Sequence, residues 1–210
     1  MAVGSGNAIK ICLVGNSRVG KSCIAERLVH DIFHEKTQST MIGRAFLHKA
    51  LTVEGETVKV NIWDTAGEEK FHSLAPMYYR YASAMVLVYD ITDTESFLNL
   101  RKFWVPSIKS CNDPSIPLAI VGNKLDLEET DRAISTEEGQ GYADILEAVF
   151  LETSAKTAHN VERIFTELIL KIRDSQRRRQ MNQAEEMEPR NVIVPHSTPA
   201  KENPLSCICH

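Results

Sequence analysis

The stretch Gly15-Asn16-Ser17-Arg18-Val19-Gly20-Lys21-Ser22 decides the fold of this chain. A near-continuous apolar run at 9–14 precedes it, and a helical pattern runs from about Lys21 to Val29. These residues match the P-loop pattern in the required place between a strand and a helix, where backbone N–H groups and the helix dipole hold phosphate groups. In this motif Lys21 reaches the β- and γ-phosphates, and the Ser22 hydroxyl ligates Mg²⁺. We therefore expect Asn16 through Cys23 to line a phosphate site.

Outward from this motif, short apolar runs alternate with helical patterns. Residues 45–53 and 57–63 flank Glu54-Gly55-Glu56, and the alternation of apolar and polar residues predicts a hairpin with one solvated face. The last helix carries an apolar stripe that starts at Val161, behind Asn160 as its N-cap. Strands that alternate with helices predict a three-layer α/β fold. The further strands are expected at 84–89, 118–121 and 148–151.

Composition describes a folded domain with a polar tail. The chain has 210 residues, a formal net charge of -4 and 43% hydrophobic residues, which argues against a nucleic-acid binder. Five scattered cysteines favour a reducing compartment over a disulfide framework. We expect no secretory signal and no apolar run long enough to span a bilayer. We expect a disordered segment at 1–7, a globular domain at 8–178 and a tail at 179–210, disordered over 181–206, where glycine and aromatic residues are absent.

A second motif, Asn123-Lys124-Leu125-Asp126, follows the predicted strand at 118–121 and selects the base. Ligands bind at the carboxyl ends of strands in open α/β sheets. A carboxylate only accepts hydrogen bonds, so Asp126 suits a base edge with two donors, which guanine presents and adenine does not. Ser154-Ala155-Lys156 follows the next strand, and we expect the Ala155 N–H to face guanine O6. Taken alone, the first tetrapeptide would most often be a surface turn.

A third motif, Asp64-Thr65-Ala66-Gly67, follows the strand that ends at Trp63. An acidic residue at a strand end beside a P-loop can hold the Mg²⁺ shell. Gly67 allows its backbone N–H to approach a γ-phosphate. The sequence therefore predicts GTP or GDP with Mg²⁺ as the ligands, with Ser22 and Asp64 on the metal.

In its motif set the chain resembles the small Ras-like GTPases, and within them the Rab family. The resemblance covers residues 8 to about 174 and includes all three motifs and the Ser154 to Lys156 segment. Rab-type stretches are Ile42-Gly43-Arg44-Ala45-Phe46 and 87–92. The run 71–80 looks most like the early-endosomal Rab subgroup.

This resemblance implies a six-stranded, mostly parallel sheet with helices on both faces, and two nucleotide-sensitive switches. It implies that Phe33 lies against the guanine and that Thr40 coordinates Mg²⁺ and senses the γ-phosphate. Lys21, Thr40, Gly67 and the following residue would carry the hydrolysis chemistry. Three aromatic residues match a triad that Rabs present to effectors, although core packing is the alternative; they are Phe46, Trp63 and Tyr78.

Two departures from the family pattern affect these roles. Glu68 stands where members usually have the Gln that orients the attacking water. Its charge near the γ-phosphate costs roughly 3 kcal/mol at about 5 Å and an effective dielectric of about 20, so we expect slow intrinsic hydrolysis. One extra residue separates Thr40 from Gly43. Counting from the P-loop selects Thr40 as the metal ligand, whereas counting back from Gly43 selects Met41, which lacks a hard oxygen.

The tail is predicted to attach the protein to a membrane. Cys207 and Cys209 resemble a Rab Cys-x-Cys ending that carries two geranylgeranyl groups, or a four-residue box that modifies Cys207 alone. Two chains give stable anchoring. The run 192–194 is either a docking segment for escort and dissociation-inhibitor proteins or only a short apolar run. We interpret 177–179, three arginines, as the end of the last helix, placed at its negative dipole end.

These residues together predict a monomeric GTP/GDP switch of vesicle and endosomal traffic. It would bind effectors in its GTP state, an exchange factor and a GAP, and cycle between cytosol and the cytoplasmic face of endosomal or other vesicle membranes. The alternative is a GTP-gated binding module with negligible intrinsic hydrolysis, which Glu68 keeps open.

Overall fold

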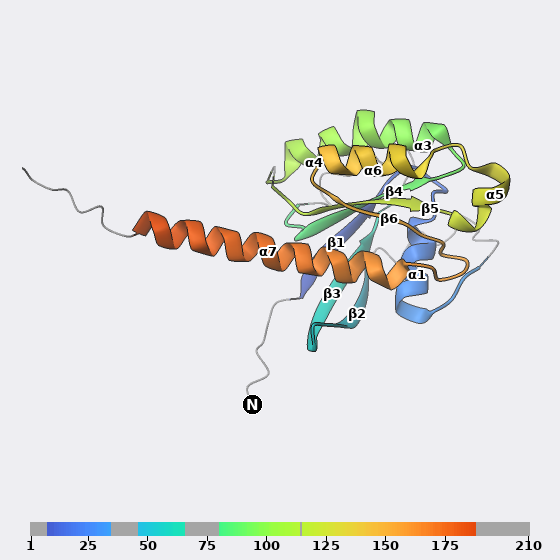
Figure 1. The fold of residues 1–210 in the computed structure, drawn as a ribbon. Helices are drawn as coiled ribbons and strands as arrows, with labels where there is room; N and C mark the ends of the chain where they lie inside the picture. Colours follow the sequence, from blue (N-terminus) through green and yellow to red (C-terminus); the bar gives the residue numbers. More distant parts are fainter. Residues whose placement is uncertain (1–7, 35–45, 66–79, 114, 188–210) are drawn as a thin grey trace, which may run out of the picture.

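The computed structural model places β1 (Ile9–Val14), the strand before the P-loop, in the middle of a six-stranded sheet (Figure 1). The structure describes residues 8–34, 46–65, 80–113 and 115–187. The strand order is β2-β3-β1-β4-β5-β6, and β2 and β3 form the antiparallel pair, while the other neighbours are parallel. The mostly parallel sheet is therefore confirmed. The other strands are β2 (Phe46–Val53), β3 (Glu56–Asp64), β4 (Ala84–Asp90), β5 (Leu118–Asn123) and β6 (Val149–Glu152).

Four of these strands, including β6, end one or two residues later than the sequence pattern predicts, and three of the four end at a polar residue near the P-loop. The added residues are polar: Asp64 ends β3, Asp90 ends β4 and Asn123 ends β5. Backbone pairing continues past the apolar stretch, since Leu13 aligns with Asp64 and Asp90 aligns with Asn123. Because the strands are parallel, all three side chains lie at the carboxyl edge of the sheet, beside the P-loop.

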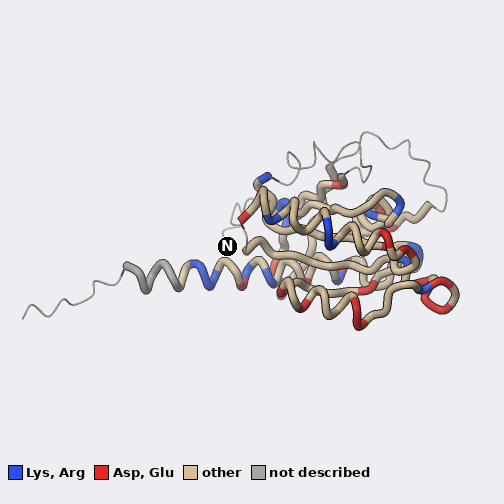
Figure 2. Tube along the Cα trace, turned by 90° about the horizontal axis from the view of Figure 1, so that it is seen from above, with Lys and Arg blue, Asp and Glu red and all other residues tan. Residues whose placement is uncertain are grey.

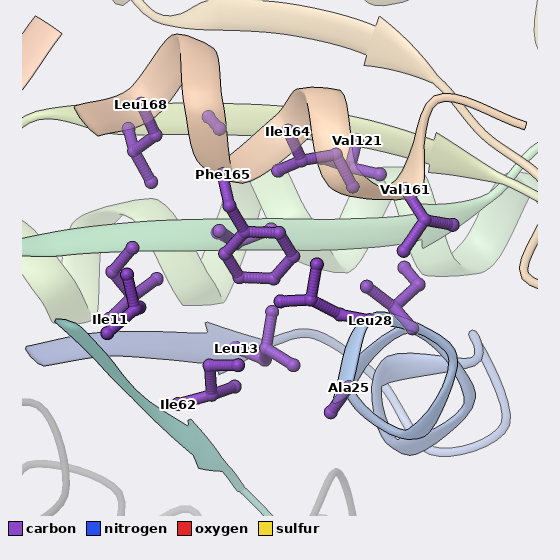
Figure 3. Close-up of a cluster of buried hydrophobic side chains, with 14 of the residues drawn as sticks. Ile11, Leu13, Ala25, Leu28, Ile62, Val121, Val161, Ile164, Phe165 and Leu168 are labelled. Atoms are coloured by element: carbon purple, nitrogen blue, oxygen red, sulfur yellow. The ribbon is translucent and has the colours of Figure 1, made fainter. Parts of the chain in front are cut away.

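Helices cover both faces of the sheet, as predicted (Figure 1). Alternation along β1 supplies both layers: Ile11 and Leu13 belong to one buried cluster, and Cys12 and Val14 belong to the other. Figure 3 shows Phe165 of α7 above the first face, among side chains from the strands and α1. The helical segments are α1 (Lys21–His30), α3 (Thr94–Asn99), the π-helix η2 (Leu100–Trp104), α4 (Val105–Cys111), the short 3₁₀-helix η3 (Leu125–Leu127), α5 (Glu128–Asp131), α6 (Thr136–Ile145) and α7 (Val161–Met187).

The last helix is longer than the sequence interpretation allowed. Helix α7 continues to Met187, so the arginines at 177–179 do not close it, and residues 181–187 are helical rather than disordered. Residues 180–187 contain neither glycine nor proline and include Ala, Glu, Gln and Met, which favour helix. The first proline of the tail is Pro189, which cannot continue a helix. The dipole interpretation is therefore wrong, because that effect is confined to the last turn.

Two arginines of α7 bind the body of the domain. Arg173 pairs with Glu54 and Glu56 of the β2–β3 hairpin at 3.1 and 2.7 Å. Arg179 pairs with Asp113 at 2.7 Å, in the connection between α4 and β5. Figure 2 shows basic positions along the helix, which runs on past the sheet in Figure 1. Each exposed pair contributes at most about 1 kcal/mol, so burial of the apolar stripe is the main attachment. Within the described ranges, no helix has both the length and the apolar character that crossing a bilayer would need.

Candidate functional site

The P-loop turn needs glycine at both of its ends. Gly15 has φ 141° and Gly20 has φ 97°, in the region that L side chains rarely adopt. A Cβ atom on Gly15 would lie 2.1 Å from the Val88 carbonyl oxygen, and one on Gly20 would lie 2.2 Å from Asn123 Nδ2. The turn is thus packed directly against the ends of β4 and β5. Ser17 and Arg18 lie exposed on its outer side.

Lys21 lies on the inner side of the loop. Its Nζ donates to the carbonyl oxygens of Gly15 and Asn16, at 2.9 and 2.6 Å, and the residue is only 5% exposed. Burial lowers the pKa of this ammonium to about 8, and the nearby Asp64 carboxylate opposes the shift. A buried cation held by two neutral carbonyls is poorly compensated, so it favours an anion in the loop.

The oxygen groups expected on Mg²⁺ lie together beside this loop. Ser22 Oγ donates to Asp64 Oδ2 at 2.5 Å. The second oxygen, Asp64 Oδ1, is buried and has no hydrogen-bond partner among the residues that the structure describes. Burial raises the pKa of Asp64, against the hydrogen bond from Ser22 and the charge of Lys21. A hydroxyl and an unsatisfied buried carboxylate oxygen are hard ligands that suit Mg²⁺. When bound, the ion would neutralise phosphate charge. Thr40, the third predicted ligand, lies outside the described residues.

Asn123 joins the P-loop to the base-recognition segments. Its Nδ2 donates to the Val19 carbonyl at 2.8 Å, and the residue is 2% exposed. Its Oδ1 accepts from Thr153 Oγ1 at 3.2 Å and from Ala155 N at 3.3 Å. One buried amide therefore fixes three segments that are far apart in the sequence.

The remaining residues of the second motif are also held in place. Asp126 Oδ1 accepts from Ser154 Oγ at 2.5 Å. Lys124 adopts φ 69°, and its Nζ pairs with Asp90 Oδ2 at 2.5 Å. Because Lys124 is left-handed, the chain turns sharply after β5, which brings Asp126 next to the segment after β6. The structure thus brings together the residues predicted to contact guanine.

The aromatic residues divide between packing and exposure. Phe33 is half-buried and packs against the cluster beneath α1 and α7. Phe46 is 47% exposed, and its ring meets the half-buried ring of Trp63 edge-on at 5.5 Å. Lys10 Nζ lies 4.5 Å from the centre of the Trp63 ring. Core packing therefore does not account for Phe46. Tyr78, Gly67, Glu68, Cys207 and Cys209 lie outside the described residues, and Cys23 packs against the first core cluster.

Sequence reasoning missed two contacts to the site. Trp104, at the end of the π-helix η2, is 1% exposed, and its indole Nε1 donates to Asn16 Oδ1 at 3.0 Å. Arg27 of α1 donates to the carbonyls of Ala155 and Lys156. From sequence alone, a tryptophan in a helix is predicted to be a core residue, and an arginine is predicted to be a surface residue. The single available signal was that the indole N–H of a fully buried tryptophan needs a hydrogen-bond acceptor.

Residues 10–174 match the family model described as the Ras family. The match covers most of the chain, so the protein belongs to the Ras family and is a small, GTP-binding switch GTPase. Members bind guanine nucleotides and Mg²⁺, and interact with effectors, exchange factors and GAPs.

Removing the metal-facing charge is expected to weaken nucleotide retention. In Asp64→Asn the unsatisfied carboxylate oxygen is replaced by a neutral amide, so GDP release in Mg²⁺ should accelerate about tenfold or more. Chelation of Mg²⁺ with EDTA should then have much less effect than in the wild type. Release of a fluorescent GDP analogue measures both. Asp174→Asn, on the exposed face of α7, is the matched control. An equal EDTA effect in both variants would contradict the assignment.

Loss of the indole donor is expected to loosen the P-loop. Trp104→Phe keeps most of the buried volume but leaves Asn16 Oδ1 without this donor, which costs about 1 kcal/mol. Nucleotide release should therefore quicken several-fold. Asn16→Ala should have a similar effect, and the double variant should be no worse than either single one. Strictly additive effects would show that the bond does not couple the two residues.

Proposed function

We propose that this protein is a Rab-type GTP/GDP switch that acts in vesicle and endosomal membrane traffic. Its guanine-nucleotide site carries the proposal most directly. Lys21, Ser22 and Asp64 lie beside a base site formed by Asn123 and Asp126. Membership of the Ras family supports the switch, and the Rab-type stretches at 42–46 and 87–92 support the narrower assignment.

In the proposed cycle, GTP orders the two switch segments through Thr40 and Gly67, and hydrolysis releases them. The ordered state would present Phe46, Trp63 and Tyr78 to effectors. The exposure of the Phe46 ring supports this surface, because apolar side chains at an interface are accessible in the free protein. An exchange factor and a GAP would drive the two halves of the cycle.

Membrane attachment is proposed to occur through Cys207 and Cys209. Prenylation of both would give stable anchoring, and an escort protein and a dissociation inhibitor would carry the modified chain between cytosol and the cytoplasmic face of endosomal membranes. The length of α7 beyond the sheet supports this attachment, because the helix carries the chain away from the domain and so lets the C-terminal cysteines reach a membrane (Figure 1).

Because of Glu68, the rate of GTP hydrolysis is the measurement that distinguishes the two hypotheses, a hydrolysing switch enzyme and a GTP-gated binding module. Glu68→Gln should hydrolyse GTP about tenfold faster or more in single turnover without a GAP, because it removes a repulsive charge and restores a donor to the water. Glu68→Ala separates the two effects: acceleration in this variant reflects charge alone. Mostly GDP in the purified wild type would favour the enzyme, and mostly GTP the module. Hydrolysis in the wild type as fast as in Glu68→Gln would refute a slowing role for Glu68.

Two prenyl groups are expected on the protein from its native membrane. Its intact mass should exceed the unmodified mass by two geranylgeranyl groups, and Cys207→Ser or Cys209→Ser should each leave the protein more soluble. One added group, lost only in Cys207→Ser, would indicate the four-residue box instead. No added mass would overturn the proposed attachment.

A further inference from the structure

A single guanidinium, that of Arg27, makes four hydrogen bonds at one end of the base site. Its Nε donates to the Ala155 carbonyl at 2.9 Å and its Nη2 to the Lys156 carbonyl at 3.1 Å. Its Nη1 donates to the Asp31 backbone carbonyl at 2.9 Å and to Asp31 Oδ1 at 2.8 Å. The Arg27 side chain is only 15% exposed. An arginine on a helix surface would normally be solvated, so this degree of engagement needs a reason.

The partners of Arg27 belong to two different walls of the expected base site. Ala155 and Lys156 belong to the segment after β6. The Ala155 N–H, which donates to Asn123 Oδ1 in this structure, is the group expected to bind guanine O6. Asp31 is the left-handed residue that ends α1, with φ 56°, and it leads directly to Phe33. Arg27 thus ties the segment that recognises the base edge to the turn that leads to the aromatic residue expected on its face.

We propose that Arg27 is a positioning residue that sets guanine selectivity, an inference that rests on the guanine-nucleotide site of the proposed function. It acts by fixing the Ala155–Lys156 backbone, with no contact to the base itself. The planar fork reaches two adjacent carbonyls and Asp31 at once. A lysine presents a single ammonium and cannot span the three. Without the Arg27 guanidinium, the carbonyls of Ala155 and Lys156 lose their hydrogen-bond donors. The backbone of this segment then becomes more mobile, and with it the Ala155 N–H that is expected to bind O6.

This role differs from simple stabilisation of α1 in one measurable way. A structural role would weaken every bound purine nucleotide equally. A role at Ala155 would weaken nucleotides that carry O6 and spare those that lack it. The diphosphate of 6-thioguanosine keeps the N1–H and the exocyclic amine of guanine but carries sulfur, a weak hydrogen-bond acceptor, in place of O6. The ratio of its dissociation constant to that of GDP therefore reports the contact at this position.

The decisive experiment measures both dissociation constants, by competition with a fluorescent GDP analogue, for wild type, Arg27→Gln and Arg27→Lys. The ratio should fall about tenfold in Arg27→Gln, the factor that corresponds to about 1.4 kcal/mol, and by a smaller factor in Arg27→Lys. Arg177→Gln is the matched control, because Arg177 makes an exposed pair with Asp174 far along α7 from its first turn, which adjoins the base segment. Its ratio should equal that of the wild type.

The outcomes separate this inference from the proposed function. An unchanged ratio in Arg27→Gln, with GDP binding weakened or not, would overturn the positioning role while the nucleotide site stands. Failure of the wild type to bind GDP would overturn both. If Arg27→Gln does not fold, Arg27→Lys decides: a lowered ratio with an unchanged melting temperature in the GDP-bound state supports the role, and an unchanged ratio refutes it.

Discussion

The buried amide of Asn123 is the contact on which the rest of the site depends. It donates to the P-loop at Val19 and accepts from Thr153 and Ala155, so one side chain sets the spacing of the phosphate and base segments. A buried polar group left unpaired costs about 1–3 kcal/mol, and a buried network is strong only when all its members are satisfied. Gly20 makes the contact geometrically accessible, since any Cβ there would collide with the amide.

The parallel sheet explains why a few polar residues are enough to form the candidate nucleotide site. The carboxyl ends of β1, β3, β4 and β5 lie at one edge, and each delivers a polar group as its pairing ends: the P-loop, Asp64, Asp90 and Asn123. Two helices then brace this edge from opposite faces of the sheet. Arg27 of α1 holds the base segment, and Trp104 of η2 holds Asn16. The local motifs thus supply the groups of the site, and contacts from the surrounding helices fix the positions of those groups.

Predictions from the sequence were best where the physical cause was local. The apolar runs gave β1, β4, β5 and β6 to within one or two residues, because a strand buried on both faces must be largely apolar. The alternating pattern gave the β2–β3 hairpin equally closely. The strand ends were less well predicted, since polar residues such as Asp90 and Asn123 still pair in the ladder. The end of α7 was misjudged because three arginines were interpreted as a terminus, although good helix formers follow them. Asn160, which directly precedes α7, also donates its side-chain amide to the Glu152 carbonyl. This hydrogen bond links the start of α7 to β6.

The sequence by itself determined the class of fold, the P-loop and the identity of the groups that are expected to face phosphate, metal and base. Each of these is encoded in a short segment whose residue types allow little else: glycines for a turn with positive φ, a lysine and a hydroxyl at fixed spacing, a carboxylate after a strand. Only the tertiary structure decided which residues hold those groups in position. Arg27 and Ala155 are 128 residues apart, and Trp104 and Asn16 are 88 apart. Such pairs are joined by the order and twist of the sheet, which no local pattern records.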